Sequence, residues 1–521
     1  MASRFAPAID AVDNAIRHST QFREWLRSRR WCGEAVGPRS EIAVKDRVLL
    51  TESGTEAIAF FLAVVREPEG QTVIHLPLSL ADARVDPDAF DLPMGQGRVY
   101  LSEAESREAY VRFVADAFEH QAKVATMAGD SLRFRGESLG AFRSMGAPLA
   151  GDSTNLLIRF STARAEVVLK SYKLPDVRNR EPEILERLHR KQFRNAPRYL
   201  GELALGQGPD RLVLGLATEF VESMDLFSWM TDGWRAELSA GGLPSTGGFE
   251  EPSLAVTGPL GDATAALHEA LFDRHPGPWQ AETFRGEDAT AARRGAITNL
   301  GESLRRLAAL AKGTDRRAAE VAAKARAFLF DQRPAIEEVL RGLDANLGTP
   351  KSVTHGDLHL GQVLRRTADG MLLFIDFEGE PERSPGQRSL KLPPLRDVAT
   401  MNRSFSYVKH YAWRTAVGGD AMSATRLLER EALSDPERSL AARLLAWEAS
   451  AAERFTSGYL GRTALYEGLR PEEAHRAIRG WMMEKALYEF RYELKYRPAN
   501  IFIPLEGIVT LANGGGKVAT R

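Results

Sequence analysis

The sequence predicts an α+β fold of two lobes with a cap subdomain at the N-terminus. Three observations predict it. Short apolar runs of strand character fill the chain between Ile42 and Val221. Helical spacing prevails from about residue 286 to 346 and again from 396 to 512. Between these helical regions, two short strands accompany a polar loop that starts at His355. The expected boundaries are 1–128 for the cap, 129–224 for the first lobe and its hinge, and 225–521 for the mainly helical second lobe.

Composition narrows the class of protein. The chain has 521 residues, of which 44% are hydrophobic, so it can build substantial cores. Lys and Arg number 69 against 70 Asp and Glu, which argues against a nucleic-acid or membrane-surface partner. The single cysteine, Cys32, excludes internal disulfides and Cys-based zinc sites. Because there is also no export signal and no run of about 20 apolar residues, we expect a cytoplasmic protein without a membrane partner.

The cap is expected to contain one helix and a sheet. An amphipathic helix is predicted from Ile9 to Trp31, where Phe22, Trp25 and Leu26 recur at helical spacing. Four apolar runs then predict an antiparallel meander. They begin at Ile42, Arg47, Ala57 and Thr72.

The first lobe is expected to hold a nucleotide between two strands. The turn Gly151–Asn155 precedes the strand Leu156–Phe160, and the strand Val167–Tyr172 follows. The turn's backbone amides and polar side chains would cradle phosphate oxygens, although this sequence also suits an ordinary surface turn. The candidate residues are Ser153, Thr154 and Asn155.

Lys170 lies on the second of these strands, next to apolar Val168 and Leu169. A buried ammonium needs an anionic partner, and phosphate together with a glutamate of the next helix would supply one. The helix glutamates are Glu181, Glu183 and Glu186. The strand Leu212–Val221 then leads to the link between the lobes, where the backbone at Glu219 and Val221 is expected to bind adenine.

The polar loop reads His355-Gly-Asp-Leu-His-Leu-Gly-Gln362, and a strand ending near Asp376 follows it. Asp357 would accept the proton of an acceptor hydroxyl, while Gln362 and Asp376 would give oxygen ligands to Mg²⁺. These are the parts that phosphoryl transfer from ATP requires.

Three neighbours of this loop have expected roles of their own. Glu378 lies two residues after Asp376, so strand alternation should point it to the same side, where it would help to hold a second magnesium ion. His355 is expected to brace the loop through backbone hydrogen bonds. His359 would face either the acceptor or the core.

The stretch from Gly241 to Gly261 is rich in Gly, Ser and Pro, and we expect it to be a surface loop. Helices are expected before it, from Asp225 to Trp234, and after it, from Ala263 to Phe272.

Three segments carry a family resemblance. The runs His355–Leu364 (HGDLHLGQVL), Ile375–Ser389 (IDFEGEPERSPGQRS) and Leu392–Tyr407 (LPPLRDVATMNRSFSY) resemble the maltokinases, alone or fused to trehalose synthase, which phosphorylate maltose at its anomeric carbon with ATP. A further matching block runs from Glu484 to Gly507. Aminoglycoside and choline kinases share the outline, usually with Asn in place of Gln362, and lack the FEGEP and PLRDVA segments. The resemblance implies the bilobal, protein-kinase-like fold of the aminoglycoside phosphotransferases.

The resemblance also implies site residues. It favours Glu183 as the helix glutamate, and it places the helical stripe Lys485, Tyr488 and Tyr492 beside the acceptor. Arg403 and Tyr407 form a second pair at i, i+4 that is also expected to contact the acceptor, whereas two other residues, Glu489 and Arg497, would be either ion pairs or ligands. The turn Arg30–Gly33 resembles a motif of the family's cap, but Gly33-Glu-Ala-Val replaces a usual Gly-Lys-Gly, so we expect a structural corner there.

The function expected from the resemblance is ATP-dependent phosphorylation of maltose to maltose 1-phosphate for α-glucan and glycogen synthesis. The resemblance also suggests trehalose synthase as a partner. One alternative is a related sugar kinase that acts on glucosamine or another hexose. Another is a non-catalytic partner of trehalose synthase. The presence of Lys170, Asp357, Gln362 and Asp376 argues against this last alternative.

Overall fold

The computed structural model describes residues 5–33, 35–67, 70–95, 97–147, 149, 155–239, 248–380, 382–417 and 433–514. The chain divides into two compact units. The first comprises Met1–Arg190 and Pro197–Val221, and the second comprises Lys191–Ala196 and Glu222–Arg521. The boundary expected near residue 128 falls inside the first unit and stays a prediction.

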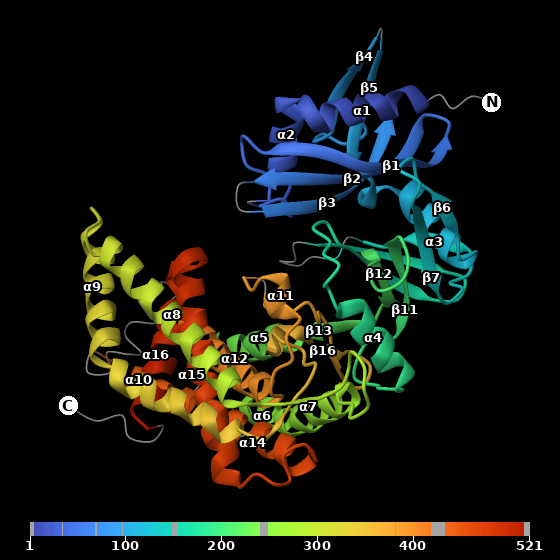
Figure 1. Cartoon of the computed structure of the whole chain (residues 1–521). Coiled ribbons are helices and arrows are strands. Elements are labelled where there is room, and N and C mark those ends of the chain that lie inside the picture. The colour runs from blue at the N-terminus through green and yellow to red at the C-terminus, as the bar shows by residue number, and fades with distance from the viewer. Residues whose placement is uncertain are drawn as a thin grey trace. The chain divides into compact units, whose positions relative to one another are not determined.

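One sheet of the first unit is covered on both faces. Its antiparallel strands have the order β1 (Glu41–Ser53), β2 (Glu56–Glu67), β3 (Gly70–Ala81), β5 (Gly97–Glu103) and β4 (Phe90–Met94). Alternate side chains of β2, such as Phe61, pack with α1 (Ala6–His18) and α2 (Thr20–Arg27), whereas Phe60 packs with α3 (Glu108–Glu119). Figure 1 shows α1 and α2 over one face of this sheet. Because both faces are buried, β2 is apolar without interruption from Ala57 to Val65.

The cap departs from the sequence prediction in two places. The single helix expected from Ile9 to Trp31 is wrong, because the side chain of Ser19 accepts a hydrogen bond from Phe22 N at 3.1 Å and starts a second helix there. The runs at Ile42 and Arg47 are not two strands either. They form one strand, β1, which has register shifts after Val44 and Leu49.

A second antiparallel sheet of the first unit carries Lys170. Its strand order is β6 (Lys123–Ala125), β7 (Ser131–Gly136), β11 (Tyr199–Leu205), β12 (Leu212–Glu219), β10 (Glu166–Ser171), β9 (Leu156–Thr162) and β8 (Phe142–Met145). Helix α4 (Glu181–Arg190) follows β10 in the chain. The two strands expected after residues 151–155, one at Leu156–Phe160 and one around Lys170, are therefore confirmed as β9 and β10.

The second unit is mainly helical, with a small antiparallel sheet of β13 (Ser223–Asp225), β16 (Val363–Arg366) and β17 (Leu372–Phe374). The helices expected between 286 and 346 and after 396 are confirmed (Figure 1). They are α8 (Gly286–Leu310), α9 (Arg316–Asp331), α10 (Arg333–Leu340), α12 (Leu395–Val417), α14 (Asp435–Arg462), α15 (Pro471–Tyr496) and α16 (Phe502–Ala512). Among the described residues, no helix has the length and apolar character to cross a bilayer.

The loop expected from Gly241 to Gly261 is wrong over its second half. Residues 240–247 lie outside the described residues, but α6 (Glu250–Ala255) and α7 (Thr257–Leu271) begin within the stretch. Its glycines let two helices touch. A Cβ on Gly261 of α7 would collide with the carbonyl oxygen of Phe455 in α14, and a Cβ on Gly458 of α14 would lie 2.5 Å from the carbonyl oxygen of Gly258. Glycine here indicates close helix packing and not a turn.

Candidate active site

The loop that carries Asp357 is fixed by the first turn of α12. The buried carboxylate of Asp397 accepts hydrogen bonds from His355 N (2.8 Å) and Gly356 N (3.1 Å), and His268 Nε2 donates to it at 3.1 Å. Burial opposes ionisation, but the bond from His268 and nearby cations keep the pKa of Asp397 below its usual value. His355 Nε2 also donates to Ile375 O at 2.9 Å, so this histidine braces the loop. Asp357 itself keeps 16% of its side chain exposed, so an acceptor can reach it.

Gln362 and Asp376 lie together, as the sequence predicts. Gln362 Nε2 donates to Asp376 Oδ2 at 3.0 Å, and Ile375 N donates to Gln362 O at the same distance. Asp376 has φ of +63°, a left-handed conformation that residues other than glycine rarely adopt. Because the Gln362 amide donates through nitrogen, its oxygen is the atom suited to a cation.

Glu378 is near Asp376 for a reason that differs from the expected one. Strand β17 ends at Phe374, and the left-handed backbone of Asp376 leads into a turn that contains Glu378. The strand alternation expected for Glu378 is therefore wrong. The carboxylate oxygens of Asp376 and Glu378 still lie within 4.8 Å of each other. Together with the Gln362 amide oxygen, they form an all-oxygen donor set of the kind that Mg²⁺ prefers.

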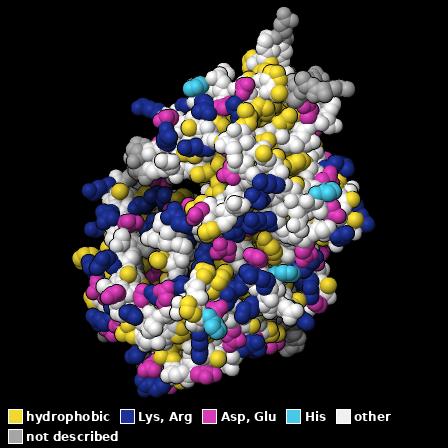
Figure 2. Space-filling view, turned by 45° about the vertical axis from the view of Figure 1, so that its right-hand side comes forward, with side chains coloured by type: hydrophobic (Ala, Val, Ile, Leu, Met, Phe, Trp, Pro, Cys, Tyr) yellow, Lys and Arg dark blue, Asp and Glu magenta, His cyan; other side chains and the backbone are white. Residues whose placement is uncertain are grey.

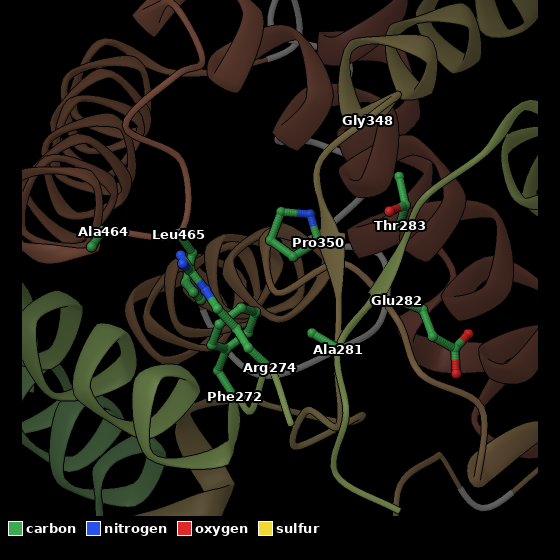
Figure 3. Close-up of a pocket in the computed structure, with 9 residues that line it drawn as sticks. All are labelled: Phe272, Arg274, Ala281, Glu282, Thr283, Gly348, Pro350, Ala464 and Leu465. Carbon is green, nitrogen blue, oxygen red and sulfur yellow. The ribbon is translucent and has the colours of Figure 1, made fainter. Parts of the chain in front are cut away.

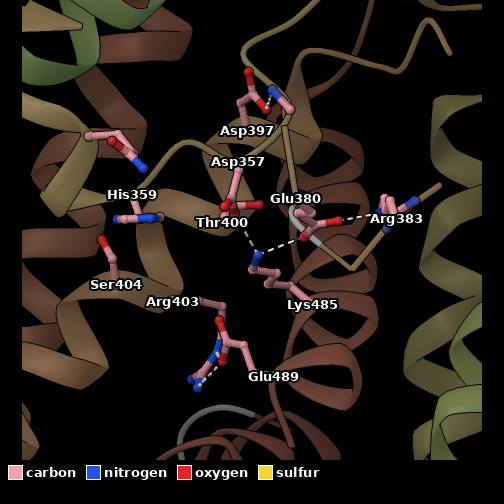
Figure 4. A network of polar contacts seen from close by, with 12 residues as sticks. Asp357, His359, Glu380, Arg383, Asp397, Thr400, Arg403, Ser404, Lys485 and Glu489 are labelled. Atoms are coloured by element: carbon pink, nitrogen blue, oxygen red, sulfur yellow. Dashed lines mark hydrogen bonds and ion pairs between the residues drawn. The ribbon is translucent and has the colours of Figure 1, made fainter. Parts of the chain in front are cut away.

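Lys485 of α15 contacts the candidate base directly. Its ammonium lies 3.0 Å from Asp357 Oδ1 and 2.6 Å from Glu380 Oε1, between the two carboxylates (Figure 4). Burial opposes the charge, but Asp357 and Glu380 hold the pKa of Lys485 above its usual value, so it stays charged. The sequence placed Lys485 beside the acceptor and did not indicate its contact with Asp357.

An ion-pair network extends from Lys485 and explains two segments of the family resemblance. Glu380, in FEGEP, binds Arg396 Nη2 at 2.8 Å and also binds Arg383. Arg396, in PLRDVA, donates through Nη1 to Gly356 O at 3.1 Å. Glu484 of α15 pairs with both arginines, at 2.8 Å to Arg383 and 3.3 Å to Arg396. The two segments thus bind each other and hold the loop of Asp357.

Arg403 and Tyr407 point into the helical core. Arg403 Nη2 pairs with Glu489 Oε2 at 2.9 Å, and Tyr407 donates its hydroxyl to Glu493 Oε1 at 3.1 Å (Figure 4 shows the first pair). Because α12 lies against α14, α15 and α16, the side chain of Arg403 is buried, and that of Tyr407 is half-buried and stays a predicted acceptor contact. The expectation that Arg403 borders an acceptor is therefore corrected, and Glu489 is a structural ion pair.

The tyrosine stripe expected on α15 is present. The rings of Tyr488 and Tyr492 stack at 6.3 Å and an interplanar angle of 18°, and the Lys485 ammonium lies 4.9 Å from the Tyr488 ring centroid. Tyr488 is buried, and within the described part of the chain its hydroxyl has no hydrogen-bond partner. His359 uses Nδ1 to accept from Gly361 N at 3.1 Å. A role in acceptor binding stays a prediction for Tyr488, Tyr492 and His359.

In the first unit, Lys170 pairs with Glu181 and not with Glu183. Lys170 Nζ lies 2.8 Å from Glu181 Oε2, whereas Glu183 lies 3.8 Å from both Arg180 and Arg211. Glu181 exposes 3% of its side chain and Glu183 exposes 41%. Residues two apart on a helix differ by about 200° in direction, so only one of them can face β10. The expected preference for Glu183 is wrong, and the alternative Glu181 is the partner.

For the other residues predicted to contact the nucleotide, a role in nucleotide binding stays a prediction. Ser153 and Thr154 lie outside the described residues, while Asn155 is buried immediately before β9. Glu219 is the last residue of β12, where its carboxylate lies 3.6 Å from Arg198, and Val221 is the last residue of the first unit.

A cavity of about 310 Å³ lies elsewhere in the second unit, beside β14 (Glu282–Thr283) and β15 (Pro350–Lys351) (Figure 3). None of the predicted site residues lines it, so it is distinct from the site of Asp357.

Basic and acidic side chains are interspersed over the face shown in Figure 2. That face therefore offers no extended surface of one charge.

Residues 146–401 match the phosphotransferase enzyme family, APH. The match covers just under half of the chain. Solved structures of a glucosamine kinase share the fold. Crystal form A is 21% identical with a TM-score of 0.61 over 98% of this chain and 99% of that chain. The complex with glucosamine, ADP and inorganic phosphate is 20% identical with a TM-score of 0.59 over 94% and 99%. The predicted fold class is confirmed.

Two relatives are similar in sequence, and both are named glucosamine kinase. That of Streptacidiphilus jiangxiensis is 31% identical over 222 residues, which are 42% of this chain and 44% of that protein. That of Mycolicibacterium smegmatis is 25% identical over 376 residues, which are 71% of this chain and 80% of that protein. The chain thus spans less than half of the first relative.

Proposed function

We propose that this protein is a sugar kinase that transfers the γ-phosphoryl group of ATP to a sugar hydroxyl. The observation that carries the proposal is the loop of Asp357. The loop is fixed by Asp397, it is reachable by an acceptor, and it lies in a segment that matches the phosphotransferase family. Asp357 accepts the proton of the sugar hydroxyl, and Lys170 binds the nucleotide phosphates. Oxygen atoms of Gln362, Asp376 and Glu378 would hold Mg²⁺, which neutralises charge on the transferred group.

Glucosamine is the first acceptor to test. Both similar proteins reported above are named glucosamine kinase, and one of them aligns over 71% of this chain. Their names support an amino sugar as the acceptor of this chain as well.

Maltose is the second candidate, because Lys485 favours an acceptor without charge. Its ammonium lies beside Asp357, where the reacting hydroxyl would bind, and it repels a second cation there. Glu380 reduces this repulsion by pairing with Lys485. The contacts observed for the FEGEP and PLRDVA segments hold the loop, so they do not distinguish maltose from another acceptor. A trehalose synthase partner is proposed only together with maltose, and a cytoplasmic location stays a proposal.

A panel of sugars with MgATP tests the proposal. Glucosamine, N-acetylglucosamine, glucose and maltose are compared at equal low concentrations, with ADP release as the readout and phosphorus NMR to locate the new ester. N-acetylglucosamine is the uncharged match for glucosamine. We expect one sugar to stimulate ADP release by about 100-fold or more over the others, because a polar pocket rejects a ligand that leaves its groups unpaired. If no sugar stimulates ADP release, the proposed function is wrong.

A second measurement separates the two acceptors. If Lys485 repels the sugar ammonium, kcat/KM for glucosamine rises with pH as the amine loses its proton, relative to kcat/KM for maltose. A ratio that does not change with pH would remove the argument for an uncharged acceptor.

A further inference from the structure

The three residues after Lys170 join the nucleotide lysine to the N-terminal cap. Ser171 ends β10, and Tyr172 and Lys173 follow it. All three side chains are buried, and that of Lys173 is 0% exposed. A buried segment with a hydroxyl, a phenol and an ammonium must satisfy each polar group internally, so its contacts define its position.

Toward the nucleotide site, the segment holds Glu181. Tyr172 donates its hydroxyl to Glu181 Oε2 at 2.6 Å, and Lys170 Nζ lies 2.8 Å from the same oxygen. The Lys170 ammonium also lies 5.6 Å from the centroid of the Tyr172 ring. Tyr172 therefore fixes the carboxylate that orients Lys170.

Toward the cap, the segment is held through side chains. Ser171 Oγ donates to Glu105 Oε1 at 3.0 Å, and Lys173 Nζ donates to the same oxygen at 2.7 Å. Lys173 also lies 5.1 Å from the Trp31 ring centroid and 3.7 Å from Glu103 Oε1. Trp31 Nε1 in turn donates to Glu103 Oε1 at 2.6 Å. If the cap moved away, Lys173 would lose its ion pairs with Glu105 and Glu103 and its contact with Trp31, so these contacts fix Lys173 to the cap.

Backbone contacts to β3 complete the attachment. His75 N donates to Lys173 O at 3.0 Å, and His75 Nδ1 lies 3.2 Å from Tyr172 O. Burial and the nearby Lys173 lower the pKa of His75 to about 3, so the ring is neutral and donates through Nδ1. Tyr172 is thus fixed at its backbone by a strand of the cap sheet.

We propose that the cap is a working part of the nucleotide site, and that Tyr172 is the positioning residue through which it holds Glu181 against Lys170. Kinases depend on this lysine–glutamate pair, and its formation is often the step that is controlled. In this protein, contacts with the cap hold Glu181 paired with Lys170. The turn Arg30–Gly33, expected to be a structural corner, supplies the Trp31 anchor. The proposal rests on the role of Lys170 in the proposed function.

The test is nucleotide binding without an acceptor, so it does not depend on the identity of the sugar. Tyr172→Phe removes the hydroxyl and keeps the ring. We expect the dissociation constant of MgADP, measured by calorimetry, to rise by about 3- to 10-fold, because one charge-assisted bond to Glu181 is lost. Tyr199→Phe is the matched control. Its hydroxyl lies on β11 near Glu202 and Glu186, and the variant should bind MgADP as the wild type does.

A second variant tests whether the cap affects MgADP binding through Tyr172. Trp31→Phe removes the donor to Glu103, so it should weaken MgADP binding by about 2- to 5-fold. In the Tyr172→Phe background, Trp31→Phe should lower MgADP affinity almost no further, because the effects of two substitutions that act through the same contact are not additive. If Trp31→Phe lowers MgADP affinity by its full 2- to 5-fold in the Tyr172→Phe background as well, the claim that the cap acts through Tyr172 is wrong. If Trp31→Phe alone binds MgADP as tightly as the wild type, the claimed role of the cap is wrong.

The remaining outcomes separate the two proposals. If Tyr172→Phe binds MgADP as tightly as the wild type, the positioning role is wrong, whatever sugar is phosphorylated. If the variants behave as expected but no sugar stimulates ADP release, the acceptor proposal fails alone. If the wild type does not bind MgADP, both are wrong.

Discussion

The candidate base shares its cation with a buried glutamate. Lys485 lies between Asp357 and Glu380, and Glu380 is also neutralised by Arg396 and Arg383. Glu380 would therefore stay compensated if Lys485 were lost, whereas Asp357 would lose a partner that fixes its rotamer. At this scale, Lys485 acts on the orientation of Asp357 more than on the stability of the core.

Lys485→Met tests this role. We expect kcat to fall by about 10- to 100-fold while KM for ATP changes by less than about 3-fold, because the lysine acts through the base. Lys409→Met is the control, since Lys409 is also buried between two carboxylates, Glu448 and Glu506. That variant should lose stability without losing the kcat of its folded fraction. A wild-type kcat for Lys485→Met would contradict the assignment.

The glutamate of α4 gives a second prediction at residue scale. Glu181→Gln removes the ion pair to Lys170, so MgADP affinity and kcat should both fall, kcat by about 10-fold or more. Glu183→Gln changes an exposed glutamate two residues away and should stay within about 2-fold of wild type. Binding and steady-state kinetics of the two variants provide the measurement. A larger loss for Glu183→Gln would restore the assignment that the structure corrects.

The sequence could predict the residues of the site that are close in the chain. Asp357 and Gln362 belong to one loop, and Asp376 lies two residues after the end of the next strand, so their spacing is enough to bring them together. The contact between Lys485 and Asp357 spans 128 positions, which no local pattern records. The choice between Glu181 and Glu183 depends on where α4 begins, and helix ends are poorly defined by sequence.

At the scale of elements, the start of α12 organises the catalytic loop. Asp397 lies in the first turn, where a carboxylate is favoured by the unpaired amides of the helix, and it accepts from His355 and Gly356. Arg396, the preceding residue, donates to Gly356 O. One helix end therefore holds both the amide and the carbonyl groups of the loop.

The close packing of α7 on α14 predicts that two glycine-to-alanine substitutions change the free energy of unfolding in opposite directions. Gly458→Ala places a methyl group against the backbone of Gly258, so we expect the free energy of unfolding to fall by about 1–3 kcal/mol. Gly461→Ala lies on the same helix with open space around it, and higher helix propensity should raise the free energy by up to about 1 kcal/mol. Urea unfolding measures both variants. Equal effects of the two substitutions would contradict the close approach.

Two errors in the predicted helices and loops have the same origin. Gly261, in a Gly- and Pro-rich stretch, favoured a loop, because sequence alone does not show that a neighbouring helix needs the missing side chain. Ser19 suited the middle of a helix by spacing, but its hydroxyl serves better as a cap. In both places a tertiary or capping contact decided the structure. The long helices after residue 286 were predictable because their periodicity is sustained.

At the scale of the whole molecule, the two units carry different parts of the proposed chemistry. The first contains Lys170, Glu181 and the cap that holds them, and the second contains Asp357 and the oxygen donors around Asp376. The fold class could be predicted because each part has a separate sequence signal. The acceptor could not, because the segments that suggested maltose serve to hold the catalytic loop.

The central claim is that Asp357 is the base of an ATP-dependent sugar kinase. The most direct measurement is the rate of sugar phosphate formation by Asp357→Asn, with Asp369→Asn, an exposed aspartate of the β16–β17 turn, as the control. The account predicts a loss of about 100-fold or more for Asp357→Asn, MgADP binding within about 3-fold of wild type, and near wild-type activity for Asp369→Asn. Product formation by Asp357→Asn at the wild-type rate would contradict it.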